Sequence, residues 1–203
     1  MNPWGASPWA VILTYEDEGH IDDSDAADID YDDLLKDMKE GTEDHNAGRK
    51  KAGFEAVHLI GWAEKPHYDA SAKKLYWAKE LSFEDTVGHT LNYDVRVLGR
   101  EGFLSMNAVA GMDRLEQIRG DMRPLIEVAE FNEGYRYAEF NSKTDRMAEY
   151  GLAALVAAGV GAKLGLFAKL GALLLAFKKV IILAFVAIGA FIKKLFGKKD
   201  ETA

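Results

Sequence analysis

The sequence has no cysteine among its 203 residues, and it lacks the short motifs that mark several enzyme classes. Without a thiol, the chain has no disulfide scaffold, no thiolate nucleophile and no Cys-ligated metal or cluster. It also contains no G-x-S-x-G, no Walker loop and no H-E-x-x-H. The missing motifs indicate no particular reaction, and we predict no cofactor.

The first residues also lack a secretory signal. Met1 is followed by neither a basic stretch nor an apolar run of about 7–15 residues. The first apolar run, Trp9–Leu13, is shorter than that and leads directly into acidic residues.

Charge divides the chain into two parts. Residues 1–149 hold 17 Lys and Arg against 31 Asp and Glu, whereas residues 150–203 hold 8 Lys against 2 acids. The second part otherwise consists almost entirely of Gly, Ala, Leu, Ile, Val and Phe. We therefore predict a soluble acidic domain over 1–149, a helical membrane anchor with a basic tail over 150–199, and a disordered end over 200–203.

Apolar periodicity predicts the elements of the acidic part. Residues 9–15 alternate as a strand does, and Asp30 is placed to cap a helix that runs to about residues 46–51. Four further strands follow, the clearest over 90–97, and a second helix covers about 112–130 with a kink or break at Pro124. Strands joined by short turns cannot form crossovers. The expected fold is therefore α+β: an antiparallel sheet with helices packed on one face, followed by a C-terminal hydrophobic helical membrane segment.

A series of local strings resembles one bacterial family. The strings are, in order, Ile29-Asp30-Tyr31-Asp32-Asp33-Leu34-Leu35, Glu40-Gly41-Thr42-Glu43 with Asn46, Gly61-Trp62 with Pro66-His67-Tyr68-Asp69, Leu75-Tyr76-Trp77-Ala78, Leu91-Asn92-Tyr93 with Leu98-Gly99-Arg100, and Arg136-Tyr137-Ala138 with Tyr150-Gly151-Leu152. Over about residues 8–195 their order and spacing are similar to those of uncharacterised membrane-anchored proteins, the domain of unknown function 2167 family. The resemblance implies a domain on the secreted side, a signal peptide, a longer N-terminal region and a C-terminal anchor. Relative to that family the chain is expected to be truncated at its N-terminus, and no activity is carried over.

The C-terminal segment is apolar enough to suggest a membrane span, but lysines interrupt it. Between residues 152 and 192 its only charges are Lys163, Lys169, Lys178 and Lys179. The expected span is Val180–Ile192, with Lys178 and Lys179 near one interface and Lys193 and Lys194 near the other. As a helix, thirteen residues measure about 20 Å, which is short of a hydrocarbon core of about 30 Å. Either the bilayer thins, or part of 164–177 joins the span, or the segment forms a helical hairpin.

The same segment contains signals for helix packing and for orientation. Ala157, Gly161 and Gly165 recur every fourth residue, a spacing that lets two helices approach closely and is compatible with a homo-oligomer. An Ala/Gly-rich helix also contains such spacings by chance. The basic tail, Lys193–Lys199, is expected in the cytoplasm. One span then places the acidic domain in the periplasm, and two spans place it inside. The domain's acidity argues against nucleic acid as a partner.

Two candidate sites stand out in the acidic domain. Asp28, Asp30 and Asp32 form a D-x-D-x-D, but the EF-hand pattern fails because its position 6 is Asp33 and its position 12 is Lys39. A looser calcium site is one interpretation, and a solvated acidic loop leading into a helix is the other. His67 and Asp69, joined by His89 if the neighbouring strands pair, suggest a metal or acid–base site. The alternative for residues 66–69 is a turn.

These observations predict a membrane-anchored envelope protein that binds or scaffolds, with the lipid bilayer as one partner and the domain in the periplasm. The sequence does not decide whether the protein is an enzyme, although the absence of catalytic motifs favours a non-enzymatic role. The first alternative is a metal-dependent or acid–base hydrolase centred on His67, Asp69 and His89. The second is a membrane-perturbing protein that acts through residues 151–199.

Overall fold

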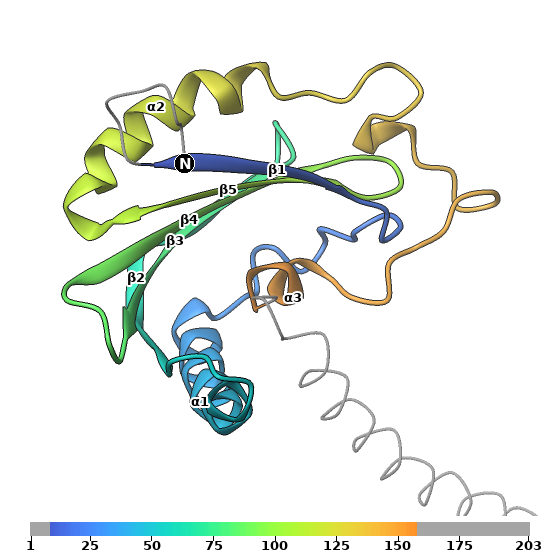
Figure 1. Ribbon diagram of the computed structural model, residues 1–203. Coiled ribbons are helices and arrows are strands. Elements are labelled where there is room, and N and C mark those ends of the chain that lie inside the picture. The colour runs from blue at the N-terminus through green and yellow to red at the C-terminus, as the bar shows by residue number, and fades with distance from the viewer. Residues whose placement is uncertain (1–8, 158–203) are drawn as a thin grey trace, which may run out of the picture. The chain divides into compact units, whose positions relative to one another are not determined.

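The structure, a computed structural model, describes residues 9–157. A five-stranded antiparallel sheet with strand order β1-β5-β4-β3-β2 forms its centre (Figure 1). The elements, in chain order, are β1 (Ala10–Glu16), α1 (Tyr31–Lys51), β2 (Val57–Asp69), β3 (Lys74–Phe83), β4 (His89–Leu98), β5 (Phe103–Gly111), a 3-10 turn (Met112–Arg114), α2 (Leu115–Val128), a second 3-10 turn (Tyr137–Glu139) and α3 (Leu152–Ala157). The α+β class and the antiparallel sheet agree with the expectation from the sequence.

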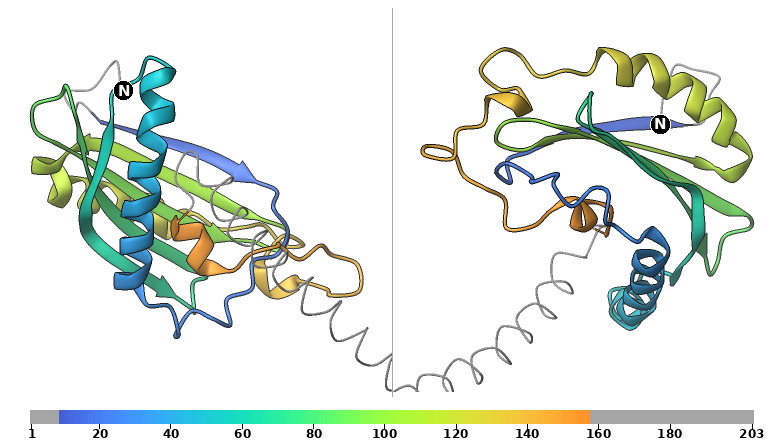
Figure 2. Two further views of the ribbon diagram at one scale, coloured as in Figure 1. Left: turned by 90° about the horizontal axis from the view of Figure 1, so that it is seen from below. Right: turned by 180° about the vertical axis from the view of Figure 1, so that it is seen from behind.

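Helices cover both faces of the sheet, so the expectation that they pack on one face is wrong. α2 lies on one face, where Ile118 and Met122 join a cluster with alternate residues of β4 such as Tyr93 and Val95. α1 and α3 lie on the opposite face (Figures 1 and 2). We call these two faces the α2 face and the α1 face.

The reason lies in the central strands, which bury side chains on both faces. On the α1 face, Leu75 and Trp77 of β3, together with Leu98 and Phe103, pack against residues of α3 and of the loop before α1. A sheet that is apolar on both sides must be covered twice. Asp94 and Arg96, polar residues of β4 on the α1 face, are buried as well.

Capping and one side-chain amide fix α1 in place. Asp30 accepts hydrogen bonds from the backbone N–H groups of Asp32 and Asp33, at 2.9 and 3.1 Å, as the sequence predicts for an N-cap. Near the other end of the helix the buried Asn46 bonds both the N–H and the C=O of Val57, each at 2.9 Å. The helix is therefore pinned to the first residue of β2.

β2 is a long edge strand rather than a short strand followed by a turn. The interpretation of residues 66–69 as a turn is wrong, because Pro66 and His67 lie within the strand. The register between β2 and β3 shifts three times, once between Glu64 and His67. Proline lacks a backbone donor and is tolerated at such irregularities on an edge.

α2 contains Pro124 and continues through it to Val128, so the predicted break does not occur, while the alternative, a kink, stays a prediction. Residues 112–114, at the predicted start, form a 3-10 turn.

α3 belongs to the folded unit. Its residues Leu152, Leu155 and Val156 are at most 1% exposed and pack in the cluster on the α1 face. A compact unit of the chain extends to Gly159. The first residues of the predicted membrane segment are therefore part of the sheet domain's core, while residues 158–203 lie outside the part that the structure describes.

Among residues 9–157, no helix has the length and apolar character needed to cross a membrane.

Candidate protein-interaction site

β1 leaves one edge of the sheet open. It pairs with β5 along all seven residues, from Ala10 opposite Val109 to Glu16 opposite Phe103, without a register shift. Its other side has no neighbouring strand in the described sheet. The close approach at its end depends on Gly102, where an added Cβ would lie 2.0 Å from the carbonyl oxygen of Glu16. The strand is thus paired in register along its inner side.

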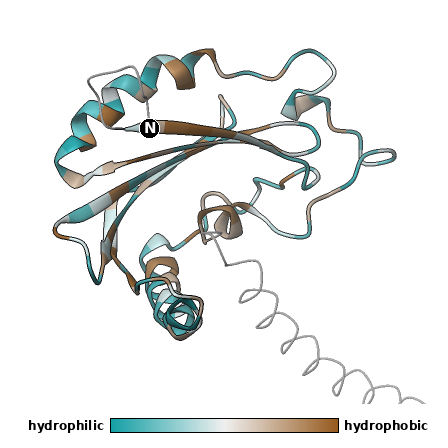
Figure 3. Cartoon of the chain, viewed as in Figure 1, coloured by the Kyte–Doolittle hydropathy of each residue, from teal (hydrophilic) through white to brown (hydrophobic). Residues whose placement is uncertain are grey.

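The exposed side chains of this strand are large and apolar. Ile12 and Leu13 are each 58% exposed and Tyr15 is 53% exposed. Cross-strand pairing places Leu13 beside Met106 on the α2 face and Ile12 beside Asn107 on the α1 face. We call the outer side of β1, with these three side chains, the β1 edge; its apolar residues appear in brown beside the N-terminal label in Figure 3.

Charge is absent from the edge itself and concentrated at one end. Residues 10–15 carry none, whereas Glu16, Asp17 and Glu18 follow immediately. Burial and the neighbouring carboxylates raise the pKa of Tyr15, so its phenol stays neutral at physiological pH. The Tyr15 ring contacts Phe131 edge-on, with ring centroids 6.1 Å apart.

The opposite edge of the sheet is protected. β2 carries the register shifts and Pro66, and Lys65 on it pairs with Asp32 of α1 at 2.9 Å. α1 packs along this strand, and the indole Nε1 of Trp62 donates to the carbonyl of Tyr31 at 3.1 Å. Bulges, proline, lysine and a covering helix are the usual devices that stop strand addition. β1 shows none of these between Ala10 and Thr14, so it is the edge at which a further strand fits.

A second cluster is a band of polar side chains on the α1 face of the three central strands. It consists of Lys79, Asn92, Asp94, Arg96 and Asn107, which we call the polar row. Asp94 faces Lys79 Nζ at 3.3 Å and Arg96 at 3.3 Å, and it accepts a hydrogen bond from Asn107 at 2.9 Å. Arg96 lies over the rings of Trp77 and Phe103, at 5.0 and 5.7 Å. Lys79, Asp94 and Arg96 are at most 8% exposed.

The polar row joins β3, β4 and β5 and leaves two buried atoms without a hydrogen bond, Asp94 Oδ2 and Trp77 Nε1. Buried charges are expensive unless they are paired. Alternation along a single strand does not predict that these polar side chains are buried together, because that depends on the register of β3, β4 and β5. These contacts form a structural ion-pair network among β3, β4 and β5, the last of which pairs with β1.

The structure places His67 and Asp69 two residues apart on β2 but does not bring His89 to them. His67 lies on β2 opposite Tyr76, and its ring stacks on Tyr76 with centroids 5.6 Å apart. Strands β3 and β4 do pair, but His89 lies opposite Ser82, at the other end of β3. Six residues along a strand measure about 20 Å. The proposed joining of His89 to this site is therefore wrong.

The remaining partners of these residues are local. His89 pairs with Glu80, and Asp69 accepts hydrogen bonds from Ser71 and Ala72 in the turn between β2 and β3. Those turn contacts lower the pKa of Asp69.

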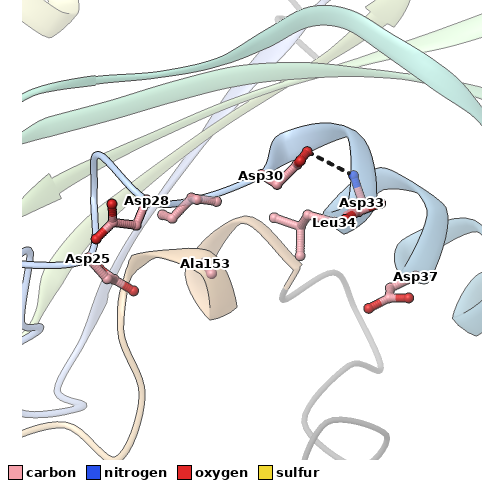
Figure 4. A pocket seen from close by; sticks show the side chains of 8 residues that line it. Asp25, Asp28, Asp30, Asp33, Leu34, Asp37 and Ala153 are labelled. Carbon is pink, nitrogen blue, oxygen red and sulfur yellow. Dashed lines mark hydrogen bonds between the residues drawn. The ribbon is translucent and has the colours of Figure 1, made fainter.

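Two of the acidic candidates, Asp28 and Asp30, line a shallow depression of about 320 Å³ (Figure 4), and Asp32 does not. Its lining residues are Asp25, Asp28, Ile29, Asp30, Asp33, Leu34, Asp37 and Ala153. The Asp30 carboxylate accepts the hydrogen bonds that cap α1, and the Asp32 carboxylate accepts a hydrogen bond from Lys65. Within residues 9–157, no group of three or more acidic or histidine side chains is arranged to hold a metal ion.

Sequence reasoning missed the hub at Asp23. Its carboxylate accepts from Lys73 and Tyr68, both at 2.6 Å, and from Tyr137 at 2.9 Å. Burial raises the pKa of Asp23, but these hydrogen bonds outweigh it and keep the pKa below the usual value. Burial and the bond to Asp23 raise the pKa of Tyr68 and of Tyr137. The hub ties the loop before α1 to the turn between β2 and β3 and to the segment before α3.

The predicted membrane and helix-packing residues fall mostly outside the described part of the chain. This holds for Lys163, Lys169, Lys178, Lys179, Lys193, Lys194, Gly161 and Gly165. Ala157 is the last residue of α3.

A family profile described as "Protein of unknown function (DUF2167)" matches residues 2–189, nearly the whole chain. No curated protein and no solved structure matches the sequence.

Proposed function

Since this chain belongs to the DUF2167 family, whose description names no activity, we propose that it is a membrane-anchored binding module of the bacterial envelope. The β1 edge recognises another protein chain by strand addition, and the hydrophobic C-terminal residues hold the domain at the bilayer. The observation that carries the binding role is the contrast between the two sheet edges. β2 is protected by several devices, whereas β1 is paired without a register shift and, from Ala10 to Tyr15, is uncharged and mostly apolar.

Photo-crosslinking tests this recognition in cells. A photoreactive phenylalanine analogue replaces Ile12, which is exposed on the β1 edge. We expect a covalent adduct on illumination and its loss when Leu13→Lys is added, because a charge on the edge opposes strand addition. The same analogue at Val87, a fully exposed residue beyond β3, serves as the matched control and yields no adduct. An adduct that persists with Leu13→Lys, or none at all, would refute the binding role.

The burial of α3 supports a single membrane span. With Leu152–Ala157 inside the domain core, the residues left for the bilayer are 158–192. As one continuous helix they would measure about 52 Å, whereas two spans need about 60 Å plus a turn. One span with a cytoplasmic basic tail corresponds to a periplasmic acidic domain.

Carbonate extraction tests the anchor. We expect the full chain to stay in the membrane pellet. The double variant Phe185→Asp/Ile188→Asp should move to the supernatant, because two acids near the middle of the span cost about 5–7 kcal/mol. Phe185→Leu/Ile188→Leu is the control that keeps the segment apolar and should remain in the pellet. Full extraction of the unmodified chain would reject the anchor.

The absence of cysteine makes the orientation measurable. A single Val87→Cys places one thiol on a fully exposed residue of the acidic domain, and Gly197→Cys places one in the basic tail. In spheroplasts, a membrane-impermeant maleimide should label Val87→Cys before lysis and Gly197→Cys only after lysis. The reverse pattern would put the domain in the cytoplasm.

A further inference from the structure

We propose that the chain added to the β1 edge is β1 of a second copy, so that two domains form one continuous sheet around a two-fold axis at Leu13. This inference rests on the proposed binding role and names its partner. It requires that β1 be complementary to itself, in its side chains, its charges and its length.

The side chains of β1 satisfy this requirement in the antiparallel direction. An axis through Leu13 and perpendicular to the sheet pairs residue 10 of one copy with residue 16 of the other along the whole strand. On the α2 face, Leu13 then meets Leu13 of the second copy, and Val11 meets Tyr15. On the α1 face, Ile12 meets Thr14. Each of the three exposed apolar side chains thereby gains a direct cross-strand neighbour.

The length of the strand selects this register. Leu13 is the midpoint of Ala10–Glu16, so only an axis at Leu13 lets all seven residues find partners. Moving the axis by one residue to Ile12 leaves Glu16 beyond the paired region and sets Tyr15 against Trp9, which precedes the strand. A one-residue change of this kind gives up backbone hydrogen bonds at both ends.

The charges select the antiparallel direction. Glu16, Asp17 and Glu18 follow β1 in both copies, so a parallel pair would place six carboxylates side by side. In the antiparallel pair the two Glu16 residues lie about 20 Å apart, at opposite ends. That is about twice the Debye length at physiological ionic strength, so their repulsion is largely screened. Anchoring in a bilayer further raises the effective concentration of the two copies.

A disulfide tests the axis directly, because the native chain has no thiol. With the axis at Leu13, a cysteine at position 13 faces its own copy at a Cβ–Cβ distance of about 4.5–5.5 Å. We expect Leu13→Cys in isolated membranes to form a species of twice the chain's mass on oxidation with copper phenanthroline. Val87→Cys, exposed but distant from β1, reports random collisions and should form none. Absence of the dimer at position 13, or equal dimer formation at both positions, would overturn the inference.

A charge substitution gives an independent measurement on the full chain in mild detergent. Leu13→Lys places two ammonium groups opposite each other at the axis and should halve the mass seen by sedimentation. Val128→Lys removes a similarly exposed apolar side chain from the end of α2 and should leave the dimer intact. A wild-type chain that sediments as a monomer would contradict the self-association.

The two proposals fail differently. If the photoreactive residue at position 12 forms a Leu13→Lys-sensitive adduct whose mass is not that of two chains, the binding role stands and the second copy is excluded. If no adduct forms at all, both are excluded.

Discussion

At the residue scale, the polar row shows how charges are kept inside a sheet domain. Asp94 is set between Lys79 and Arg96, while Asn107 fills one of its acceptor positions. Removing one member of such a group leaves the others buried and unpaired, which costs more than the group contributes as a whole. The three charges therefore act as a unit.

We expect Asp94→Ala to destabilise the domain by about 3–5 kcal/mol, because two buried cations lose their carboxylate. The triple variant Lys79→Met/Asp94→Leu/Arg96→Met should be less destabilised than Asp94→Ala, since no charge is left unpaired. Urea unfolding of the full chain in mild detergent measures both. If the single change costs under about 1 kcal/mol, the polar row contributes little to stability.

Asp23 introduces a dependence on pH. Its pKa in the folded domain lies below the unfolded value of 3.8, so the stability it contributes is present above about pH 4 and is lost as the pH falls through the folded pKa. We expect Asp23→Asn to cost about 2 kcal/mol at pH 7, where Lys73 bonds a charged carboxylate. The difference from wild type should shrink at pH 3.

Unfolding in urea at the two pH values measures this effect. Asp28→Asn, an exposed carboxylate in the same loop, should change stability by less than about 0.5 kcal/mol at either pH. If Asp23→Asn lowers the free energy of unfolding by the same amount at pH 7 and at pH 3, the charge of Asp23 does not contribute to stability.

At the element scale, the joint between α1 and β2 depends on one amide. Asn46 bonds both backbone groups of Val57 and also donates to Glu43 at 3.1 Å. An amide side chain can do this because it carries a donor and an acceptor side by side, as a neighbouring strand does. The joint keeps α1 over the β2 edge and so contributes to the protection of that edge.

We expect Asn46→Ala to cost about 2–3 kcal/mol, since it removes two hydrogen bonds and leaves the backbone groups of Val57 without partners. Asp44→Ala, an exposed change on the same helix, should cost under about 0.5 kcal/mol. Thermal unfolding compares the two. If Asn46→Ala and Asp44→Ala change the stability equally, the hydrogen bonds of Asn46 to Val57 do not stabilise the domain.

At the scale of the whole molecule, the boundary between domain and anchor is decided by packing. Leu155 is 1% exposed in the core cluster on the α1 face. Leu155→Ala should therefore destabilise the sheet domain by about 2–5 kcal/mol through the cavity it leaves. Leu125→Ala, at a position 41% exposed on α2, should cost much less. If Leu155→Ala leaves urea unfolding unchanged, α3 does not stabilise the domain.

Several elements were predictable because their signals are local. Alternation marks β1 and β4, and the acids after Asp30 mark the start of α1, because strand and helix periods and capping act within a few residues. The bulged path of β2 through Pro66 was not predictable, since the competing turn signal is equally local and only pairing with β3 overrides it.

The candidate sites divide in the same way. A pair of residues such as His67 and Asp69 looks like a site because it is close in sequence, yet the register of β3 and β4 determines where His89 lies. Conversely, the hub joins Asp23, Lys73 and Tyr137 from three segments that are far apart in the sequence, and no sequence spacing predicts these contacts.

Composition and short-period patterns were enough to reveal the division into an acidic part and a hydrophobic, lysine-bearing part, the α+β class and the family, because these signals can be recognised without knowing which segments are neighbours. The open edge strand, the buried charges and the inclusion of residues 152–157 in the domain core became visible only in the folded domain. Those properties depend on which segments are neighbours in space, and strand order and packing are set by the whole chain at once.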